Sequence, residues 1–465
     1  MKNKNLPVKK NENYIVKIED IGSVGEGIGK IDGYAMFTQG AVVGDIVELK
    51  AVKVGNSFGY GKLLNIVEPS KYRIEPKCKN FLLCGGCQVQ DYSYEAQLEF
   101  KRRKVQNNIE RIGGIYDVEV LPTIGMATPW NYRNKAQFPV GLKDGKIQIG
   151  FYAPRSHNII EFETCHIQHK INDEIIKIVK EFMQEYNIKP YDEVSCKGVI
   201  RHILTRVGFV TGEIMVCVVI NGKKLPYVDR LIEKLKSIDG MESISLNFNS
   251  NNNNVILGDK TETVWGKGFI TDYIGNVKFE ISPNSFYQVN PVQTKVMYDK
   301  AMEYAQLTGN ETVFDAYCGI GTISLFLAQK AKKVYGVEIV EAAIKDAKKN
   351  AEINNITNAE FYTGKSEEII PKLYREKGIK ADVIVVDPPR KGCDTQLLQT
   401  ILDMLPERIV YVSCDSATMA RDLKILCSTQ KYKVEKVQPV DNFCQTWHVE
   451  CVVLMSRKTV KNELW

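Results

Sequence analysis

Cys414 stands directly after an apolar run with the composition of a buried strand, in the stretch "YVSCDSATMARDL". Glycine, asparagine or aspartate would be the ordinary residue at such a strand end. A helix is predicted to begin at Ser416, and a thiol beside a helix N-terminus is expected to have a lowered pKa. A single cysteine is also commonly a small core residue, so its chemistry depends on the groups that the fold places near it.

A glycine turn in "DAYCGIGT" is the second feature that could do chemistry. Gly319 and Gly321 allow a tight turn between a predicted strand and a helix, with close approach of a ligand to the backbone. Glu338 ends the next predicted strand, about 20 residues on, where a carboxylate binds ribose hydroxyls. The loop lacks the Lys-Ser/Thr of a phosphate-binding loop and the third glycine of a dinucleotide site. It suits a nucleoside without pyrophosphate, such as S-adenosylmethionine, although a G-x-G can also be only a turn.

The motif "DPPRKG" places Asp387 at the end of a later predicted strand. The two prolines stop the strand and stiffen the turn, which is a structural reason for the motif. However, open α/β sheets bind ligands at the carboxyl ends of their parallel strands. Many methyltransferases that act on the exocyclic amines of adenine and cytosine have an aromatic residue after a similar Pro-Pro pair. Arg390 occupies that position here, which disfavours amine methylation.

Glu450 is the candidate partner of Cys414 in a reaction at a pyrimidine ring. It lies in the apolar stretch "HVECVVLM", where a carboxylate is costly unless it is ion-paired or does chemistry. C5 of uracil is too weak a nucleophile to take a methyl group directly. Addition of a thiolate to C6 makes C5 nucleophilic, and a base must then remove the C5 proton before the thiolate leaves. That chemistry needs one thiol and one base.

Four motifs in order along the chain resemble those of the RNA uracil-5-methyltransferase family: "FDAYCGIGT", "DPPRKG", "YVSCDSATMARDL" and "DNFCQTWHVE". "SFYQVNP" resembles the family motif whose glutamine, here Gln288, binds S-adenosylmethionine. The resemblance covers essentially the whole chain and implies that Cys414 is the nucleophile and Glu450 the proton acceptor. It implies cofactor binding by Gln288, Tyr317, Glu338 and Asp387. Ser416 and Cys444 depart from the family, where proline is common at both positions.

A set of cysteines precedes this region. Cys78, Cys84 and Cys87 follow a C-x5-C-x2-C pattern in "CKNFLLCGGC", with Cys165 as a distant fourth candidate. Four soft thiolates suit zinc or an iron–sulfur cluster, and the spacing does not distinguish them. A zinc site could also use His166 or His169, and unliganded buried cysteines are a further alternative. The family resemblance implies a [4Fe–4S] cluster held by the four cysteines, structural or RNA-contacting, since methyl transfer has no redox step.

The elements that must position these residues fall into three predicted domains. Residues 1–70 contain alternating, glycine-broken strands near 10–68, which predict a small β-barrel that resembles a TRAM RNA-binding domain. Residues 71–285 are expected to form a central α+β domain with the cysteine set, including a helix in "YEAQLEFKRRKVQNNIERIG". Residues 286–465 alternate β-rich runs with amphipathic segments. That alternation predicts the doubly wound, α/β sheet of a Rossmann-like methyltransferase, ending in an antiparallel pair.

Basic and aromatic residues indicate how RNA would be bound. "KRRK" at 101–104 is one basic run, and Arg133, Lys135 and Arg155 form a second group. Such runs are also common on solvated faces. The interleaved aromatics that could stack on bases, although most such aromatics are core residues, are Tyr132, Phe138, Phe151 and Tyr152. A uracil in structured RNA would have to be flipped out to reach Cys414.

The composition limits the class of protein. The chain has 465 residues, a net charge of +6 and 12 cysteines. This length allows two or three domains, and the mild positive charge permits a nucleic-acid partner without requiring one. The basic start "MKNKNLPVKK" lacks the apolar core of a signal peptide, and no apolar run approaches the roughly 20 residues of a membrane helix. We expect a cytoplasmic protein without disulfides.

Together these features predict an S-adenosylmethionine-dependent enzyme that forms 5-methyluridine in 23S ribosomal RNA through a covalent adduct between Cys414 and C6. The TRAM resemblance and the cysteine set favour large-subunit ribosomal RNA, modified before full ribosome assembly. A tRNA uracil-5-methyltransferase is the alternative enzyme. A catalytically inert, RNA-binding iron–sulfur protein is the alternative of another class, which the intact Cys414 and Glu450 disfavour. We also expect a monomer with no membrane association. The identity and number of target uridines stay open.

Overall fold

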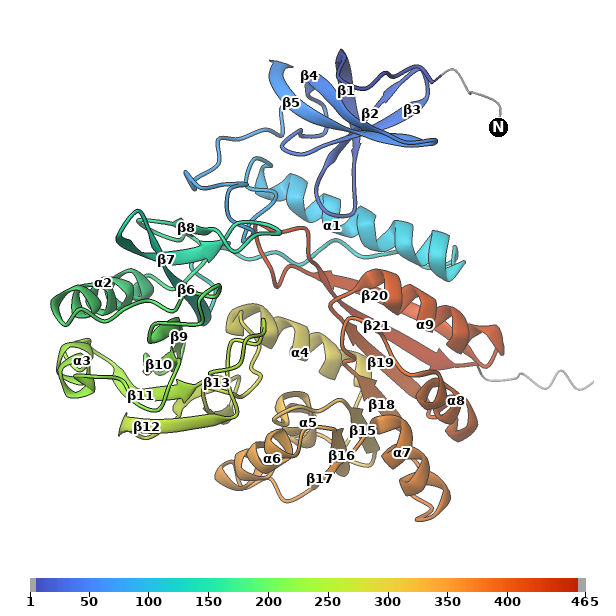
Figure 1. The fold of residues 1–465 in the computed structure, drawn as a ribbon. Coiled ribbons are helices and arrows are strands. Elements are labelled where there is room, and N and C mark those ends of the chain that lie inside the picture. The colour runs from blue at the N-terminus through green and yellow to red at the C-terminus, as the bar shows by residue number, and fades with distance from the viewer. Residues whose placement is uncertain (1–5, 459–465) are drawn as a thin grey trace, which may run out of the picture.

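The structure, a computed structural model, describes residues 6–458. The basic N-terminal stretch therefore lies partly outside the described residues, because residues 1–5 are not among them. Within residues 6–458 the strands form a closed barrel, two seven-stranded sheets and one two-stranded sheet (Figure 1). No helix in this range is long and apolar enough to cross a membrane.

The N-terminal strands close into the predicted small barrel, drawn in blue at the top of Figure 1. They are β1 (Asn13–Ile21), β2 (Gly27–Ile31), β3 (Tyr34–Thr38), β4 (Ile46–Val54) and β5 (Phe58–Glu68). Alternate side chains point inward, so that Val16, Ile18 and Leu49 are buried while their strand neighbours are not. The order β1-β2-β3-β5-β4 is closed, and closure leaves the barrel without a free edge.

A mostly antiparallel sheet forms the centre of the chain. Its elements are β6 (Lys135–Lys143), β7 (Lys146–Tyr152), β8 (Ile159–Glu161), α2 (Ile171–Glu185), β9 (Ile200–Val207), β10 (Ile214–Ile220), α3 (Val228–Leu235), β11 (Met241–Phe248) and β12 (Lys260–Gly266). The strand order is β12-β11-β10-β9-β6-β7-β8. Strand β10 is buried along its whole length, in agreement with its unbroken apolar sequence "IMVCVVI". This sheet confirms the predicted α+β character of the central region.

The C-terminal region begins with a hairpin and a long helix, and then alternates strands with helices. Its elements are β13 (Ile270–Ile274), β14 (Val277–Ile281), α4 (Pro291–Ala305), β15 (Thr312–Ala316), α5 (Thr322–Ala328), β16 (Lys333–Glu338), α6 (Glu341–Ile353), β17 (Ala359–Thr363), α7 (Ser366–Arg375), β18 (Val383–Val386), α8 (Thr395–Met404), β19 (Arg408–Ser413), α9 (Ser416–Ser428), β20 (Tyr432–Val440) and β21 (Glu450–Arg457). The sheet order is β17-β16-β15-β18-β19-β21-β20.

The first five of these neighbouring strands are parallel, and β21 and β20 are antiparallel to their neighbours. The predicted Rossmann-like sheet with an antiparallel end is therefore confirmed. Because parallel strands end at one edge, the loops after β15, β16, β18 and β19 gather there. Apolar side chains from helices on both faces cover the sheet and form two clusters of buried residues.

One long helix connects the three regions. Helix α1 (Tyr94–Asn108) continues into a π-helical turn, η1 (Ile109–Gly113). Ser93 begins it, since its side-chain oxygen accepts from the Ala96 backbone N–H at 3.4 Å. Val105 and Ile109 are buried in the same apolar cluster as residues of α9. In Figure 1, α1 lies between the barrel and the C-terminal sheet. The helix therefore packs the barrel side of the chain against the C-terminal sheet.

Candidate active site

The glycine turn after β15 has the geometry that the sequence predicts. Gly319 and Gly321 have φ angles of 56° and 83°, which residues with a side chain rarely adopt. A Cβ at Gly321 would lie 3.2 Å from Ala347 Cβ, so this turn also packs tightly. A Cβ at Gly319 would meet nothing within 4 Å. The backbone at Gly319 thus borders open space, where a ligand can approach.

Glu338 ends β16 beside this turn, as predicted. Its carboxylate accepts hydrogen bonds from the Gly319 N–H at 3.2 Å and from the Val340 N–H at 2.9 Å. The side chain is therefore positioned against the turn, with free lone pairs for the hydroxyls of a ribose. Two carboxyl groups nearby have raised pKa values. Burial raises the pKa of Asp315 to about 7, and that of Asp387, directly after β18, to about 6.

Strand pairing brings Cys414 and Glu450 together, although 35 residues of chain separate them. Ser413, the last residue of β19, pairs with Cys451 of the antiparallel strand β21. One step farther along this register, Cys414 meets Glu450, which begins β21. Cys414 is half-buried and Glu450 is 3% exposed. A thiol and a carboxyl group thus share the sheet edge that also carries Gly319, Glu338 and Asp387.

The expected lowering of the Cys414 pKa is wrong. Burial raises it to about 12, and the nearby carboxylates of Glu450 and Asp387 act in the same direction. The helix end does not offset these effects, because Asp415 already caps α9. Its Oδ1 accepts from the Ala417 N–H at 2.9 Å and from the Thr418 N–H at 3.2 Å. Only Arg390 among the main influences lowers the pKa of the thiol.

Glu450 has no ion-pair partner among residues 6–458, so the alternative of an ion-paired strand residue is not what the structure shows. Burial raises its pKa well above the usual value, Asp387 raises it further, and Arg390 lowers it. A carboxyl group with a raised pKa at this depth can take part in proton transfer once a substrate changes its surroundings. Arg390, which the sequence analysis used only against amine methylation, is thus a site residue that it missed.

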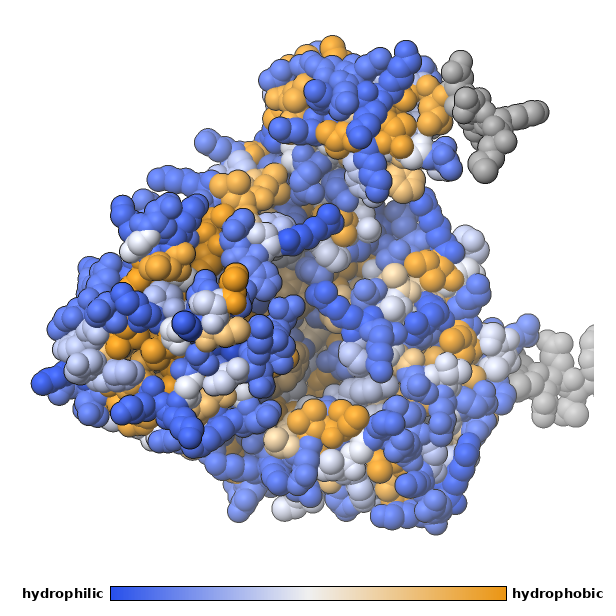
Figure 2. All heavy atoms as spheres, viewed as in Figure 1, coloured by the Kyte–Doolittle hydropathy of each residue, from blue (hydrophilic) through white to orange (hydrophobic). Residues whose placement is uncertain are grey.

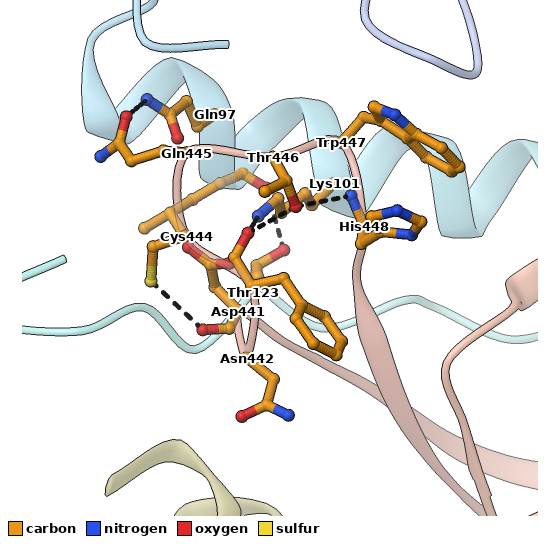
Figure 3. Close-up of polar contacts among 12 residues, drawn as sticks. Gln97, Lys101, Thr123, Asp441, Asn442, Cys444, Gln445, Thr446, Trp447 and His448 are labelled. Carbon is orange, nitrogen blue, oxygen red and sulfur yellow. Dashed lines mark hydrogen bonds and ion pairs between the residues drawn. The ribbon is translucent and has the colours of Figure 1, made fainter. Parts of the chain in front are cut away.

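The loop 441–448, which leads into Glu450, is held on helix α1 (Figure 3). Asp441 accepts from Lys101 Nζ at 2.5 Å and from the Tyr94 hydroxyl at 2.8 Å. One turn away on the helix, Gln97 donates to the Gln445 side chain at 3.0 Å. Lys101 is completely buried and cannot bind RNA, contrary to the expectation for the run at 101–104. Its role is to position the loop that carries the candidate base.

The same loop is bonded to the start of α4, and this contact draws the "SFYQVNP" stretch toward the site. Asn290 Nδ2 donates to the Asn442 carbonyl at 3.1 Å, and Gln293 Nε2 donates to the Asp441 carbonyl at 3.2 Å. Gln288 is half-buried, and its carbonyl accepts from Asn134 Nδ2 at 2.9 Å. The backbone in front of the catalytic edge is thus fixed from both sides.

Tyr317 adopts an unusual backbone conformation for a residue with a side chain, with a φ of 77°. Its N–H donates to the Val337 carbonyl at 3.0 Å, so that the first turn after β15 is joined to β16. The predicted cofactor residues Tyr317, Glu338 and Asp387 therefore follow adjacent strands at one edge. Gln288 comes from the separate loop before α4.

These motifs coincide with matches to known families. The model of the tRNA (uracil-5-)-methyltransferase family matches residues 93–458, and the TRAM-domain model matches residues 7–64. The chain belongs to the tRNA (uracil-5-)-methyltransferase family. It is an S-adenosylmethionine-dependent RNA methyltransferase of the uracil-5 type with an N-terminal TRAM barrel, which confirms the predicted enzyme class.

Relatives and a solved structure agree with this assignment. An uncharacterized RNA methyltransferase of Clostridium tetani is 56% identical, over 97% of this chain and 98% of that protein. One from Halalkalibacterium halodurans is 52% identical, over 98% of this chain and 100% of that protein. The crystal structure of the Pyrococcus abyssi tRNA (uracil-54, C5)-methyltransferase with S-adenosyl-L-homocysteine has a TM-score of 0.77 and 29% identity. It covers 95% of this chain and 100% of that chain.

A cavity of 490 Å³ lies between the central and C-terminal regions of the methyltransferase. Figure 2 shows the surface hollowed between these two halves. Arg390 and His448 line it from the catalytic side, and Arg133 and Lys135 line it from the central region. The pKa of Lys135 falls to about 8, mainly through burial and then through the neighbouring Arg206 and Arg133. This basic lining suits an RNA backbone, as expected for Arg133 and Lys135.

The four predicted metal ligands, Cys78, Cys84, Cys87 and Cys165, line this same cavity, and none forms a disulfide. Among residues 6–458, no three His, Cys, Asp or Glu side chains are grouped closely enough to bind one metal ion. This result supports neither the zinc site nor the iron–sulfur cluster. Metal binding itself stays a prediction.

The aromatic side chains divide into two groups. Tyr132 and Phe138 are 1% and 0% exposed, so they are core residues and not base-stacking candidates. Phe151 and Tyr152 are half-buried beside the cavity. Trp447 and His448, just before Glu450 in the chain, are a further aromatic pair that was not predicted, with ring centroids 3.7 Å apart in a stacked arrangement. Two aromatic residues within "DNFCQTWHVE" were the available signal for this pair.

Proposed function

We propose that this methyltransferase transfers a methyl group to C5 of a uridine in 23S ribosomal RNA, with Cys414 as nucleophile and Glu450 as base. The observation that carries the proposal is the register of β19 and β21, in which Ser413 pairs with Cys451, so that the next residues, the half-buried Cys414 and the buried Glu450, come together. Glu450 forms no ion pair among the described residues, and Arg390 is the cation that acts on it. A structural cysteine and a structural glutamate would not need to meet at the ligand-binding edge of the sheet.

The raised pKa of Cys414 means that the free enzyme holds a thiol and not a thiolate at neutral pH. The thiol must lose its proton when the uracil arrives. The substrate displaces water, and Arg390 is the cation that lowers the pKa of both Cys414 and Glu450. We assign to Arg390 the stabilisation of the negative charge that develops during addition to C6. After C5 takes the methyl group, the Glu450 carboxylate, which must first have released its own proton to solvent, accepts the C5 proton. The electron pair of the C5–H bond forms the C5–C6 double bond as the C6–sulfur bond breaks and the thiolate leaves.

S-adenosylmethionine supplies the methyl group when it is bound at the edge beside the glycine turn. Glu338 is proposed to bind the ribose hydroxyls, because its carboxylate is already held at that turn. Asp387, Tyr317 and Gln288 complete the proposed binding set. The free space at Gly319 supports this placement, since a ligand can approach the backbone there without a clash.

The four cysteines are proposed to hold a [4Fe–4S] cluster beside the RNA path. What supports this is the donor set itself, four thiols that line one cavity. The cluster would tie the segment after the barrel to the loop that carries Cys165. Because Arg133 and Lys135 line the same cavity, the cluster would shape the surface that contacts RNA.

The choice of 23S ribosomal RNA rests on the resemblance of the motifs, the barrel and the cysteine set to ribosomal RNA enzymes. Cys414 is only half-buried at an open edge, so a flipped uridine in RNA not yet covered by ribosomal proteins could reach it. Such a substrate agrees with the expected cytoplasmic location.

A tRNA uridine is the second candidate substrate, and a specific observation favours it. The solved structure that resembles this chain over 95% of its length is named for position 54 of tRNA. Because the match covers 95% of this chain, the part left unmatched is shorter than the N-terminal barrel, so the match includes barrel residues. The presence of an N-terminal barrel therefore does not by itself distinguish the two substrates.

The test offers both RNAs to the same enzyme. Unmodified 23S ribosomal RNA and a tRNA transcript are incubated with enzyme and labelled S-adenosylmethionine, and 5-methyluridine is mapped by mass spectrometry. Label at one or two uridines of the ribosomal RNA is the expected result. Label in the tRNA alone would transfer the assignment to tRNA, and label in neither would overturn the proposed function.

A further inference from the structure

A second cavity, of 420 Å³, lies in the central region outside the catalytic edge. Its walls come from β6, β7 and β9, together with the loop that follows Tyr191. Rings form much of these walls. Tyr152 and His157 are stacked with their centroids 5.0 Å apart, and the Arg201 guanidinium lies 4.4 Å above the Tyr191 ring. Flat walls of this kind accept a planar aromatic ligand.

Acidic and unpartnered polar groups also line this cavity. Glu193 contacts both stacked rings, because it accepts from the Tyr152 hydroxyl at 3.2 Å and its other oxygen is within hydrogen-bond distance of His157 Nδ1. Asp192 lies next to it in the lining. His202 is 6% exposed, and its Nδ1 has no hydrogen-bond partner among the described residues. Buried polar atoms without partners are uncommon in native proteins and indicate a group that a ligand can complete.

The 420 Å³ cavity shares lining residues with the 490 Å³ cavity, which borders the candidate active site. Tyr152 and His202 line both this cavity and the 490 Å³ cavity whose far side carries Arg390 and His448. The Tyr152 and His202 rings are 6.4 Å apart, so the two spaces meet across one pair of side chains. An RNA strand whose target uridine lies at Cys414 can therefore run past Arg133 and Lys135 and reach the second cavity with another nucleotide.

The charged groups of the lining select among the bases. Two carboxylates, Asp192 and Glu193, and two cations, Lys143 and Arg201, line the cavity. Arg201 Nη1 already donates to the Asn249 and Asn251 carbonyls at 2.8 Å, so the carboxylates are the groups that offer hydrogen-bond acceptors to a base. A carboxylate offers only acceptors. Guanine presents two adjacent donors, N1–H and the 2-amino group, which one carboxylate can accept together. Adenine places the acceptor N1 beside its amine, and uracil flanks its single N–H with two carbonyls. Burial lowers the pKa of His202 to about 4, so its ring is neutral and adds no competing charge.

We propose that this cavity binds an unpaired guanine of the RNA substrate, with Glu193 accepting from N1–H and the 2-amino group and with the Tyr152 and Tyr191 rings beside the base. The inference rests on the proposed function in one respect, that the substrate is RNA. It assigns to the central region the recognition of a nucleotide other than the target uridine. Glu193 thus determines substrate selection without taking part in methyl transfer.

The first test needs no knowledge of the RNA substrate. Full-length protein is saturated with S-adenosylhomocysteine to fill the cofactor site, and saturation-transfer NMR is recorded with guanosine and with adenosine as probes. Glu193→Gln is compared with Glu262→Gln, a matched change of an exposed carboxylate on β12 at the far edge of the same sheet. We expect transfer to guanosine in the wild-type protein and in the Glu262 variant, and its loss in the Glu193 variant. Equal transfer to guanosine and adenosine, or an unchanged signal in Glu193→Gln, would overturn the proposal.

The second test measures the effect on catalysis. Each guanine of a methylated RNA fragment is replaced in turn by inosine, which lacks the 2-amino group. One replacement should raise KM about tenfold for the wild-type enzyme and leave KM of Glu193→Gln unchanged, because the contact is already lost there. Affinity for S-adenosylmethionine should be equal in both proteins. If Glu193→Gln has the KM of Glu262→Gln, the pocket does not recognise the base. If the wild-type enzyme methylates no RNA, the proposed function fails, and the nucleoside experiment still decides the pocket.

Discussion

Lys101 Nζ lies 2.5 Å from Asp441 Oδ1, and neither side chain is exposed to solvent. The two residues are 340 positions apart in the chain, on helix α1 and on the loop that leads to Glu450. A buried ion pair is stabilising only while both partners are present, since either charge alone is left without solvent or counter-ion. This pair therefore couples the position of the candidate base to the helix between the barrel and the catalytic sheet.

Lys101→Met should destabilise the protein by about 3–5 kcal/mol, because Asp441 would stay buried without its cation. Methyl transfer should also fall, since the loop before Glu450 loses its main anchor. Arg103→Met is the matched control on the same helix. Its partner Asp20 is 3.2 Å away, and both are exposed, so the change should cost within about 1 kcal/mol. Chemical denaturation of both variants measures the difference, and equal stabilities would refute an anchoring role.

Variants that lack the Cys414 thiol or the Glu450 carboxylate should stop the reaction at different steps. Cys414→Ala has no nucleophile and should form neither adduct nor 5-methyluridine. In Glu450→Gln, Cys414 can still add to C6 and C5 can still be methylated, but no base removes the C5 proton. A methylated protein–RNA complex should therefore accumulate. A denaturing gel with labelled methyl donor separates the outcomes. Release of methylated RNA by Glu450→Gln at the wild-type rate would exclude Glu450 as the base.

Asp387 should lower the stability of the free enzyme at neutral pH. Burial raises its pKa from 3.8 to about 6, so the folded state binds this proton more tightly than the unfolded state. The resulting stability is present below pH 3.8 and is lost as the pH rises through 6. Because the side chain is only half-buried, we expect Asp387→Asn to be more stable at pH 7 by about 1–2 kcal/mol.

The gain from Asp387→Asn should be smaller at pH 5 than at pH 7, as measured by urea unfolding at both values. Cofactor affinity should fall in the same variant, because the carboxylate is part of the proposed binding set. Asp403→Asn changes an exposed aspartate on α8 and serves as the control. A gain that does not depend on pH would show that the charge of Asp387 is not its cause.

Glu338→Gln should weaken S-adenosylmethionine binding by about 1–3 kcal/mol, the cost of a lost charge-assisted hydrogen bond. Calorimetry measures the affinity directly. Glu341→Gln, an exposed change in the following helix, should leave the affinity unchanged. Equal affinities in the two variants would remove Glu338 from the cofactor site.

The cysteine set should hold iron. Protein purified without oxygen should be brown and contain iron and acid-labile sulfide, and Cys87→Ser should lose both. Cys196→Ser replaces an exposed cysteine elsewhere in the central region and should keep them. A colourless wild-type protein with one equivalent of zinc would contradict the cluster.

Much of the architecture follows from local sequence patterns and could therefore be predicted from the sequence. The period of apolar residues and the turn residues predict the barrel strands, the alternation of strands with helices and the antiparallel end of the last sheet. The rule that parallel strands end at one edge then groups Gly319, Glu338, Asp387 and Cys414. These predictions need only neighbouring residues and one topological rule.

Other properties depend on contacts between residues far apart in the chain. The basic run at 101–104 predicts a solvent-exposed face, but Lys101 is buried in an ion pair with Asp441. Tyr132 and Phe138 read as possible stacking residues, yet packing buries both. The burial of an ionisable or aromatic side chain follows from which surfaces meet, and no local pattern contains that information.

The sequence by itself determined which residues can do chemistry at the catalytic edge, because residue type and strand order are enough to place a thiol and a carboxyl group there. Only the tertiary structure decided their protonation. The Cys414 pKa was expected to fall beside a helix end, but burial of the thiol and the nearby carboxylates of Glu450 and Asp387 raise it, and Asp415 already caps that helix end. A pKa is the sum of desolvation and of all nearby charges, and these are set by the complete fold.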